Sequence, residues 1–323
     1  MTLLLGAYAA SPNVTGWDPT LETAYYQQLK TLPQLSGLEH PFTGNLHPHD
    51  DSWFLANIDP AWNYVFTTIP GVMNALAQNP RFGLASTDQV GRQAAIDFMQ
   101  LANQAIAKLN QHLGRQAVSA IMLHSAPARQ HASSSEQAFQ ASLTTLLSWD
   151  WHGASVLLEH CDALLPGQKP SKGFLSLEQE LSVLADLNQT LKPERPLGVV
   201  INWGRSVLET RTPDGALAHL QAAKAQGLLK GLMFSGISDK ANAYGAWQDS
   251  HQPAQSSELV PFGEPGSWLT EEAIQQCLFA CAGADLTVLG LKIGIRPLTA
   301  SLAERINYLR AQLAILVRHR VSM

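Results

Sequence analysis

The chain has 323 residues, of which 46% are hydrophobic and 15% are charged, and its net charge is −5. These values favour a well-packed globular protein over a disordered one. The acidic balance, with no clustered basic stripe, argues against a general nucleic-acid binder.

Cysteine content and hydropathy set two further limits. The chain has three cysteines, too few for a disulfide framework, which favours a reducing, cytoplasmic setting. The apolar N-terminal run is short and lacks a positive flank, so we interpret it as a first strand rather than a signal peptide. No segment approaches the roughly 20 apolar residues of a membrane span, so we expect no membrane partner.

Apolar strand-like runs alternate with longer amphipathic segments along the chain. The strands are predicted at residues 3–9, 37–40, 64–68, 118–124, 155–159, 197–202, 231–235 and 287–293. The helices are predicted at 21–31, 89–113, 134–149, 175–191, 214–226, 270–282 and 298–317. Eight strands with helices between them are typical of an α/β fold, here a (β/α)₈ TIM barrel forming a single domain over 1–323. Long βα loops are expected after strand two (41–63) and strand seven (238–268).

Polar residues stand at the C-terminal ends of the predicted strands, where TIM barrels place their chemistry. These candidates are Glu39, His40, His124, Glu159, Asn202, Trp203, Arg205, Ser235, Lys292 and Arg296. Together they could surround one substrate with a carboxylate base, an imidazole, a lysine and an amide. Any one of them could instead be a satisfied polar group at the barrel rim.

Glu159 and Lys292 are the strongest single candidates. Glu159 ends a buried strand, where a carboxylate is costly unless it is paired, protonated or bound to a metal. It could be a general base or a metal ligand. Lys292 lies within an apolar run and, if it faces the barrel, must meet a carboxylate, a substrate anion or a carbonyl. A lysine that extends outward to solvent is the alternative.

Two short polar tracts could bind metal. The first is His47-Pro-His49-Asp50-Asp51 in the loop after strand two, and the second is Asp249-Ser-His251 in the loop after strand seven. Both could also be solvated loops, because metal binding requires ligands that converge in space.

At these residues the chain resembles the xylose-isomerase-like TIM barrels, which include sugar isomerases, sugar-phosphate epimerases and metal-dependent apurinic (AP) endonucleases of family 2. The resemblance implies that Glu159 and His124 correspond to metal ligands on strands five and four. It also matches Asp249-Ser-His251 to an Asp-x-His motif that follows strand seven. A narrower resemblance, through Asn202-Trp-Gly-Arg205, is to an uncharacterised bacterial branch of sugar-isomerase-like proteins.

The sequence departs from that superfamily at several ligand positions. Asn202 stands in place of a carboxylate, Arg205 and Ser235 in place of imidazoles, and Lys292 in place of a glutamate. These changes remove ligands and add two cations, so a cluster of several ions is not expected. Two alternatives stay open for the cofactor. One is a single divalent metal (Zn²⁺, Mn²⁺ or Mg²⁺) held through Glu159, His124, Asp249 or His251, and the other is a metal-free site in which Lys292 and Arg205 supply the positive charge.

The leading functional hypothesis is an isomerase or epimerase of a sugar or sugar acid that transfers a proton within its substrate. Glu159 would act as the base, Lys292 or a metal would stabilise the enolate, and His124 would assist. The small carbohydrate would be bound by the remaining candidates, which are Glu39, His40, Asn202, Trp203, Arg205, Ser235 and Arg296. The alternatives are a non-catalytic carbohydrate-binding barrel and, with less support, a metal-dependent endonuclease. The oligomeric state, monomer or homodimer, is left open.

Overall fold

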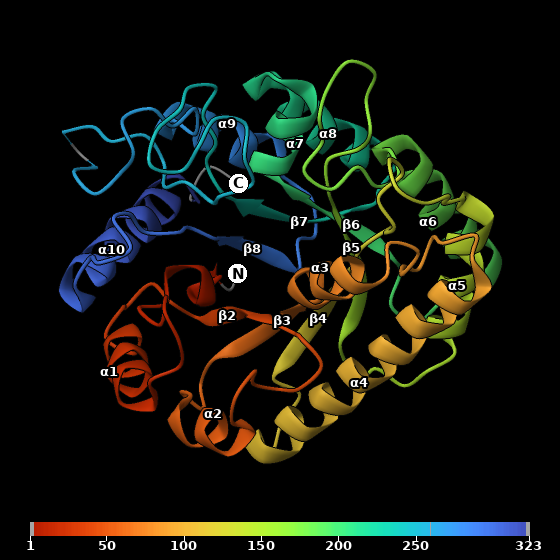
Figure 1. The fold of residues 1–323 in the computed structure, drawn as a ribbon, viewed down its shortest axis with the longest axis horizontal. Helices are drawn as coiled ribbons and strands as arrows, with labels where there is room; N and C mark the ends of the chain where they lie inside the picture. The colour runs from red at the N-terminus through yellow and green to blue at the C-terminus, as the bar shows by residue number, and fades with distance from the viewer. Residues whose placement is uncertain (1–2, 259, 321–323) are drawn as a thin grey trace.

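A computed structural model describes residues 3–258 and 260–320, and its eight parallel strands close into a barrel in chain order (Figure 1). The strands are β1 (Leu4–Leu5), β2 (Gly37–Pro41), β3 (Asn63–Thr67), β4 (Val118–Leu123), β5 (Ser155–His160), β6 (Gly198–Asn202), β7 (Leu229–Phe234) and β8 (Val288–Leu291). β1 pairs with both β2 and β8, which closes the barrel. The predicted TIM-barrel fold is therefore confirmed.

Helices form a ring around the barrel (Figure 1). They are α1 (Pro19–Leu29), α2 (Asp51–Asn57), α3 (Ile69–Gln78), α4 (Gln89–Leu113), α5 (Glu136–Leu147), α6 (Leu177–Leu191), α7 (Trp203–Thr210), α8 (Pro213–Ala225), α9 (Glu271–Ala280) and α10 (Leu302–Arg320). Among residues 3–258 and 260–320, no helix combines the length and apolar character that a bilayer span requires.

Local sequence signals explain where several helices begin. Ser176 caps α6, and its side chain and that of Gln179 satisfy each other's backbone amides as a capping box. Asp50 caps α2, because its carboxylate accepts hydrogen bonds from the amides of Ser52 and Trp53 at 2.8 and 3.0 Å. The loop predicted over 41–63 therefore contains a short helix.

Three helices and the first strand differ from the prediction. The sequence analysis missed α2, α3 and α7, which are short and follow closely on strands or turns. Strand β1 is shorter than residues 3–9, because the chain turns into the 3₁₀ helix η1 (Ala7–Ala10) directly after Gly6.

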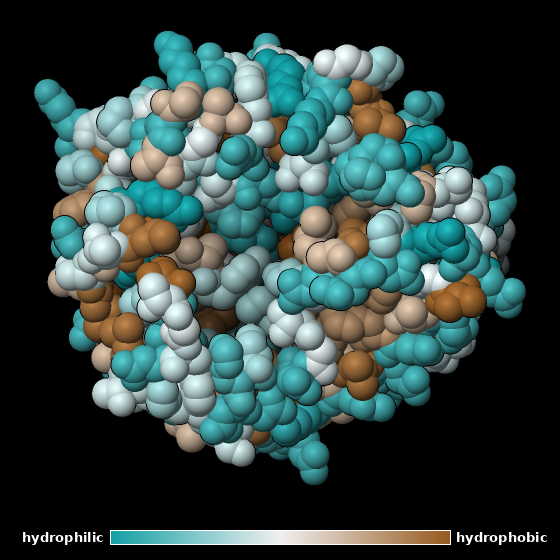
Figure 2. Space-filling view, viewed as in Figure 1, coloured by the Kyte–Doolittle hydropathy of each residue, from teal (hydrophilic) through white to brown (hydrophobic). Residues whose placement is uncertain are grey.

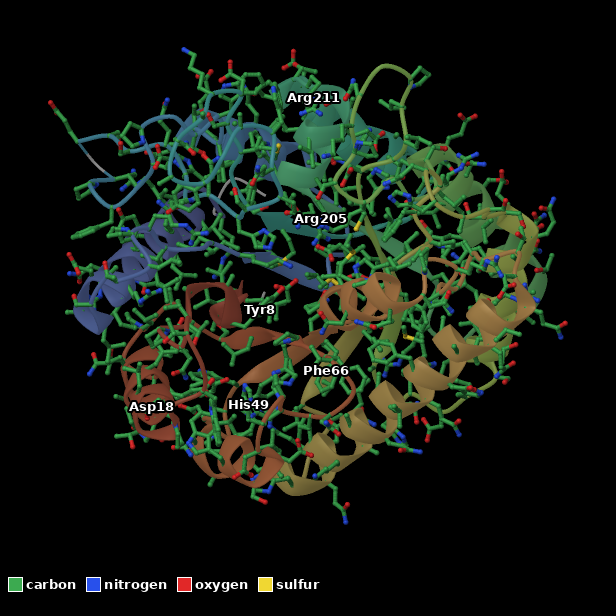
Figure 3. The ribbon with its side chains drawn as sticks, in the orientation of Figure 1. Tyr8, Asp18, His49, Phe66, Arg205 and Arg211 are labelled. Atoms are coloured by element: carbon green, nitrogen blue, oxygen red, sulfur yellow. The ribbon has the colours of Figure 1, made fainter. Side chains whose placement is uncertain are left out.

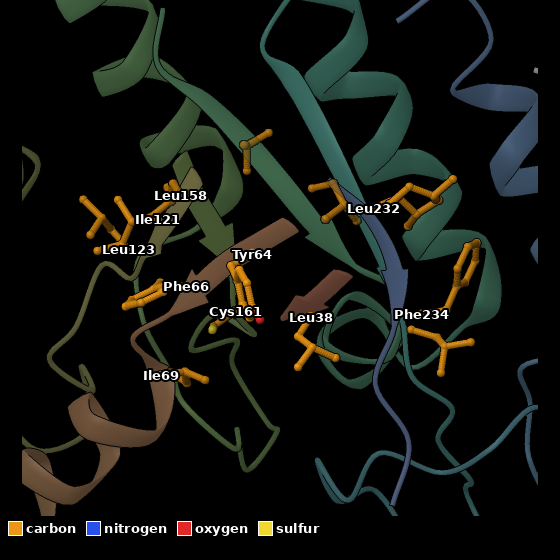
Figure 4. Close-up of a cluster of buried hydrophobic side chains, with 14 of the residues drawn as sticks. Leu38, Tyr64, Phe66, Ile69, Ile121, Leu123, Leu158, Cys161, Leu232 and Phe234 are labelled. Carbon is orange, nitrogen blue, oxygen red and sulfur yellow. The ribbon is translucent and has the colours of Figure 1, made fainter. Parts of the chain in front are cut away.

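The alternation of side chains along each strand divides the core into two parts. Apolar residues that point into the barrel form one small cluster: Leu4, Val65, Ala120, Met122, Leu157, Val200, Met233 and Val288. Their neighbours along the strands point outward and pack beneath the helices in a much larger cluster, part of which is shown in Figure 4. Because strand side chains alternate, the next inward residue on most strands lies two positions further on, at the mouth of the barrel.

Candidate active site

The inward-facing residues at the mouth form a layer of polar side chains above the apolar inner cluster. They are Glu39, Thr67, His124, Glu159, Asn202, Ser235 and Lys292, and each is at most 1% exposed. On β4, β5, β6 and β7 the polar residue stands two positions after an inner-cluster residue, as Glu159 does after Leu157. The strand period thus gathers groups from seven strands into one site.

Glu159 is held at the centre of this layer by three donors. His124 Nε2 lies 2.9 Å and Arg205 Nη1 lies 2.7 Å from Glu159 Oε2, and Asn202 Nδ2 donates to Oε1 at 3.0 Å. We call these four residues, with Asp249 and Lys172, the Glu159 network. Both carboxylate oxygens of Glu159 are therefore engaged by protein groups.

Supporting hydrogen bonds fix the orientation of two of these donors. Asn202 Oδ1 accepts from Ser235 Oγ at 3.1 Å and from the Arg205 amide at 3.4 Å, so the Nδ2 group must face Glu159. His124 Nδ1 lies 3.1 Å from Thr68 Oγ1. Thr68 Oγ1 also lies 3.0 Å from the Met122 carbonyl oxygen, and its one hydrogen serves either that oxygen or Nδ1. A neutral His124 with its proton on Nε2 donates to Glu159 and takes the Thr68 hydrogen at Nδ1 in place of the Met122 carbonyl.

The pKa values in the network follow from burial and charge. Burial would raise the pKa of Glu159, but the charges of Arg205 and Lys292 and the His124 hydrogen bond hold it well below its ordinary value. Burial lowers the pKa of His124 to about 4, against the attraction of Glu159. At neutral pH the site therefore holds an ionised Glu159 and a neutral His124.

Arg205 links Glu159 to a second buried carboxylate. Its Nε lies 3.2 Å from Asp249 Oδ2, and Lys172 Nζ lies 3.1 Å from the same oxygen. His251 Nδ1 stands 3.3 Å from Asp249 Oδ1. Burial would raise the pKa of Asp249, but Lys172 and Arg205 hold it well below its usual range. The long loop after β7 thus closes back onto the barrel through an ion pair.

Glu39 and Lys292 form a separate pair on the opposite side of the mouth, and we call it the Glu39 pair. Lys292 Nζ donates to Glu39 Oε1 at 2.7 Å and to the Tyr8 hydroxyl at 3.1 Å. Glu39 Oε2 is buried and has no hydrogen-bond partner among the described residues. Burial raises the pKa of Glu39, and Lys292 offsets that rise only in part. Glu39 is therefore more basic than an ordinary glutamate.

Gly6 is required by this pair. A Cβ at this position would stand 2.6 Å from Glu39 Oε2 and 2.9 Å from Lys292 Cγ. Any larger residue would therefore displace the carboxylate oxygen or the lysine stem.

A cavity of about 190 Å³ opens beside the Glu39 pair. Tyr8 and Glu39 form part of its lining, and its outer wall includes Trp17, His47 and His49. The rings of Trp17 and His49 are stacked, with their centroids 5.1 Å apart. Figure 3 shows Tyr8 and Arg205 near the centre of the ring of helices, and Figure 2 shows that face hollowed near its middle. Glu39 is thus one of the residues that line the cavity, although it is only 1% exposed.

The side chains predicted to bind a metal instead contact cationic side chains and an amide of the protein itself. Arg205 lies between Glu159 and Asp249, and the amide nitrogen of Asn202, a donor, takes the other oxygen of Glu159. His124 directs Nε2 at Glu159 rather than at a shared point. Arg205 already supplies the positive charge at this place. The four predicted ligands, Glu159, His124, Asp249 and His251, therefore do not form a coordination site for one divalent ion.

The histidine and aspartate tract after β2 has a structural role. Asp50 caps α2, Asp51 accepts from the His47 amide at 2.7 Å, and Lys108 Nζ lies 2.6 Å from Asp51 Oδ2. The imidazoles of His47 and His49 line the cavity instead. This tract is therefore a helix cap and a cavity wall rather than a metal cluster.

Three predicted substrate-binding residues lie away from the polar layer. His40 points outward, lies 2.5 Å from the Leu46 carbonyl oxygen through Nε2 and packs between Phe54 and Phe66, so it only borders the cavity. Trp203 is fully buried in the outer core, and this position does not support its predicted contact with the carbohydrate. Arg296 stacks its guanidinium over Tyr244, 5.2 Å from the ring centroid.

The sequence analysis missed Thr67 of the polar layer and also three residues that support the site. Tyr8 reaches Lys292 from η1, Thr68 orients His124, and Lys172 pairs with Asp249 from the loop after β5. Asp162, at the end of β5, holds that loop by accepting from the amides of Ser171 and Lys172. The polar character of Asp162 was visible in the sequence, but the loop it organises was not.

Solved structures with a similar fold include two sugar epimerases of low sequence identity. They are an L-ribulose 3-epimerase (TM-score 0.57, 13% identity, 98% of this chain and 93% of that chain covered) and the 3-keto-D-glucoside 4-epimerase of E. coli (0.52, 14%, 91% and 92%). A xylose isomerase domain protein from Alicyclobacillus acidocaldarius also matches (0.52, 12%, 99% and 99%). The fold is similar to that of xylose isomerase-like TIM barrels, as the resemblance found in the sequence implied for the fold.

Within this fold the chain belongs to the family described as Domain of unknown function (DUF4862), whose family model matches residues 4–308. A relative from Salmonella typhimurium, described as an uncharacterized protein, is 36% identical over 310 residues, which cover 95% of this chain and 94% of the relative.

Proposed function

We propose that this protein is an isomerase or epimerase of a small sugar or sugar acid, with Glu39 as the carboxylate base. One observation carries the proposal: Glu39 lines the cavity and keeps one oxygen without a protein partner among the described residues. Glu159, the base expected from the sequence, has donors on both oxygens and a lowered pKa. A base needs a free lone pair and a proton affinity close to the working range, so Glu39 suits the role better.

The Glu39 pair can move a proton and stabilise the charge that results. Glu39 Oε2 would take the proton from the carbon next to a substrate carbonyl, and the electron pair would move to the carbonyl oxygen as an enolate. Neutralising Glu39 removes the partner charge of Lys292, which lies 2.7 Å from Oε1, so the ammonium charge becomes available to the enolate. Returning the proton to the neighbouring carbon, while the proton of the adjacent hydroxyl moves to the former carbonyl oxygen, completes an isomerisation. An epimerisation instead requires that a second donor, such as water, delivers a proton to the opposite face of the same carbon.

Tyr8 has the groups to assist this step. It accepts a hydrogen bond from Lys292, so its own hydrogen is free to donate to a substrate oxygen. Burial and the nearby Glu39 raise the pKa of Tyr8, which keeps the hydroxyl protonated. Tyr8 is therefore a neutral donor beside the base.

The cavity supports a small carbohydrate as the substrate. Its volume of about 190 Å³ is below the roughly 300–1,000 Å³ of pockets for drug-sized ligands. Its wall combines the stacked rings of Trp17 and His49 with the polar groups of Glu39 and Tyr8. An apolar ring face with hydroxyl-binding groups beside it matches a sugar. The named epimerases that share the fold are consistent with this substrate class.

Solvent exchange tests the proposal directly. We would incubate the protein in D₂O with a panel of ketoses, aldoses and sugar acids, and follow deuterium entry next to the carbonyl by NMR. We expect exchange with at least one sugar, and a loss of about 10²–10⁴-fold in Glu39→Gln, because the amide cannot take a proton but can still accept from Lys292. Exchange undiminished in Glu39→Gln would rule out Glu39 as the base. Glu178→Gln, an exposed change on α6, is the control and should keep the full rate.

A non-catalytic carbohydrate-binding barrel is the second candidate. The observation that favours it is the complete internal pairing of Glu159, which leaves that carboxylate no free oxygen for chemistry. This candidate predicts saturable sugar binding by calorimetry with no deuterium exchange in the wild-type protein. The metal-dependent endonuclease lacks such support, because Arg205 and Lys292 stand among the positions that would hold its ions.

A further inference from the structure

The outer face of β5 carries a second buried polar cluster, separate from the barrel site. His160 follows Glu159 and therefore points to the opposite side of the sheet. It meets Glu180 of α6 and Glu209 of α7, and His219 of α8 stands beside Glu209. The proposed proton transfer uses none of these residues.

Three of these side chains have the geometry of metal ligands. His160 Nε2 lies 3.2 Å from Glu209 Oε2, and His219 Nε2 lies 3.8 Å from Glu209 Oε1. Zinc bonds of 2.0–2.1 Å in a tetrahedron place neighbouring ligand atoms about 3.3 Å apart. The ligand atoms of His160, Glu209 and His219 all lie within 4.8 Å of one another, so closing the triangle needs a shift of at most about 1.5 Å.

The other ring nitrogens are held by partners of the kind that orient metal-bound histidines. His160 Nδ1 lies 2.6 Å from Glu180 Oε2, and Glu180 in turn accepts from Ser125 Oγ. His219 Nδ1 lies 3.0 Å from Ser206 Oγ. When Nδ1 carries the proton toward such a partner, the lone pair of Nε2 is free for a metal. Both histidines direct Nε2 toward Glu209, and the Ala163 amide fixes the Glu209 carboxylate at 2.7 Å.

We propose that His160, Glu209 and His219 form a binding site for one divalent transition metal of the zinc class. Two imidazoles and one carboxylate suit Zn²⁺ and leave a fourth position for water. The side chains of Glu209 and His219 are 8% and 14% exposed, so an ion can enter from solvent on this side.

The position of the site suggests a structural role. It joins the end of β5 to α7 and α8, and α7 also carries Arg205, which pairs with Glu159 in the barrel. A bound ion would fix α7 against β5 and so hold Arg205 in place. The competing arrangement is an imidazolium at His160 shared by Glu180 and Glu209, with no metal. Burial alone would lower the pKa of His160, but the two carboxylates raise it to about 10.

Zinc titration of the full chain distinguishes the two arrangements. The protein would be stripped with a chelator, and Zn²⁺ binding would be measured by competition with a chromophoric indicator. We expect one equivalent to bind, a loss of at least 100-fold in affinity in His219→Asn, and about 10-fold in Ser206→Ala, which removes only the partner of His219 Nδ1. His112→Asn, the same change at an exposed histidine of α4, should bind as the wild type does.

Thermal unfolding gives an independent readout, because an ion that binds only the folded state raises the melting temperature. We expect Zn²⁺ to raise it in the wild type and in His112→Asn but not in His219→Asn. Less than 0.1 equivalent bound, or equal affinity in the wild type, His219→Asn and Ser206→Ala, would overturn the proposal and leave the imidazolium arrangement. Because neither readout uses turnover, this result is independent of the proposed isomerase activity.

Discussion

The two carboxylates at the barrel mouth, Glu39 and Glu159, are equally buried but differ in what surrounds them. Glu159 has three donors on its two oxygens, and Glu39 has one lysine on one oxygen and a cavity beside it. The pKa of Glu159 is held low, and that of Glu39 is raised. Burial alone therefore does not mark a catalytic carboxylate. The two carboxylates differ in the number of donors on their oxygens, and on this ground we propose Glu39 rather than Glu159 as the base.

Removing the cation from each carboxylate should give the largest difference. Arg205→Met leaves Glu159 and Asp249 without their shared partner, and we expect a loss of about 3–5 kcal/mol of unfolding free energy. Lys292→Met should cost less, because Glu39 already has a raised pKa and can stay protonated. Urea unfolding measures both, with exposed Arg129→Met as a control that should change stability by less than about 1 kcal/mol. An equal loss of unfolding free energy in Arg205→Met and Lys292→Met would contradict this difference between the two carboxylates.

Acid unfolding should depend on the Glu159 network. Asp249 has a folded pKa below its unfolded value, so its stabilising effect is complete above about pH 4 and is lost as the pH falls toward the folded pKa. We expect Asp249→Asn to remove on the order of 2 kcal/mol of the stability that the wild type loses between pH 5 and pH 2. Chemical unfolding across this range is the measurement. Identical slopes in the two proteins would show that Asp249 is not held ionised by Lys172 and Arg205.

The smallest expected effect tests the orientation of His124. Thr68→Val keeps the shape of the side chain but removes the hydroxyl, which lies 3.1 Å from His124 Nδ1 and 3.0 Å from the Met122 carbonyl oxygen, and leaves Nδ1 unpaired. We expect a loss of about 1–2 kcal/mol, read from the midpoint of urea unfolding. Thr144→Val, at an exposed position on α5, is the matched control and should lie within about 0.5 kcal/mol of the wild type. A Thr68→Val protein as stable as the control would mean that His124 is oriented by Glu159 alone.

The regular elements were largely predictable, because their signals are local. The helix predicted over 89–113 matches α4 at both ends, and Ser176 and Gln179 form a capping box, a local signal, at the start of α6. The missed helix α7 starts at Asn202, whose side chain both caps the helix and binds Glu159. Its residues follow a strand without a break, so the sequence offered no turn signal. Trp203 directly follows the inward-facing Asn202, so the alternation of side chains already directs it to the outer core, where it is buried.

The sequence by itself determined which strands carry polar residues toward the mouth of the barrel. Side chains along a strand alternate between its two faces because of backbone geometry, and the apolar run before Glu159 fixes which residues face inward. Only the tertiary structure decided which of these groups pair. Lys292 meets Glu39 across 253 residues of chain, and Lys172 reaches Asp249 from a loop with no regular structure. These pairings depend on barrel closure and on loop paths that no local pattern encodes. They move the proposed base from Glu159 to Glu39.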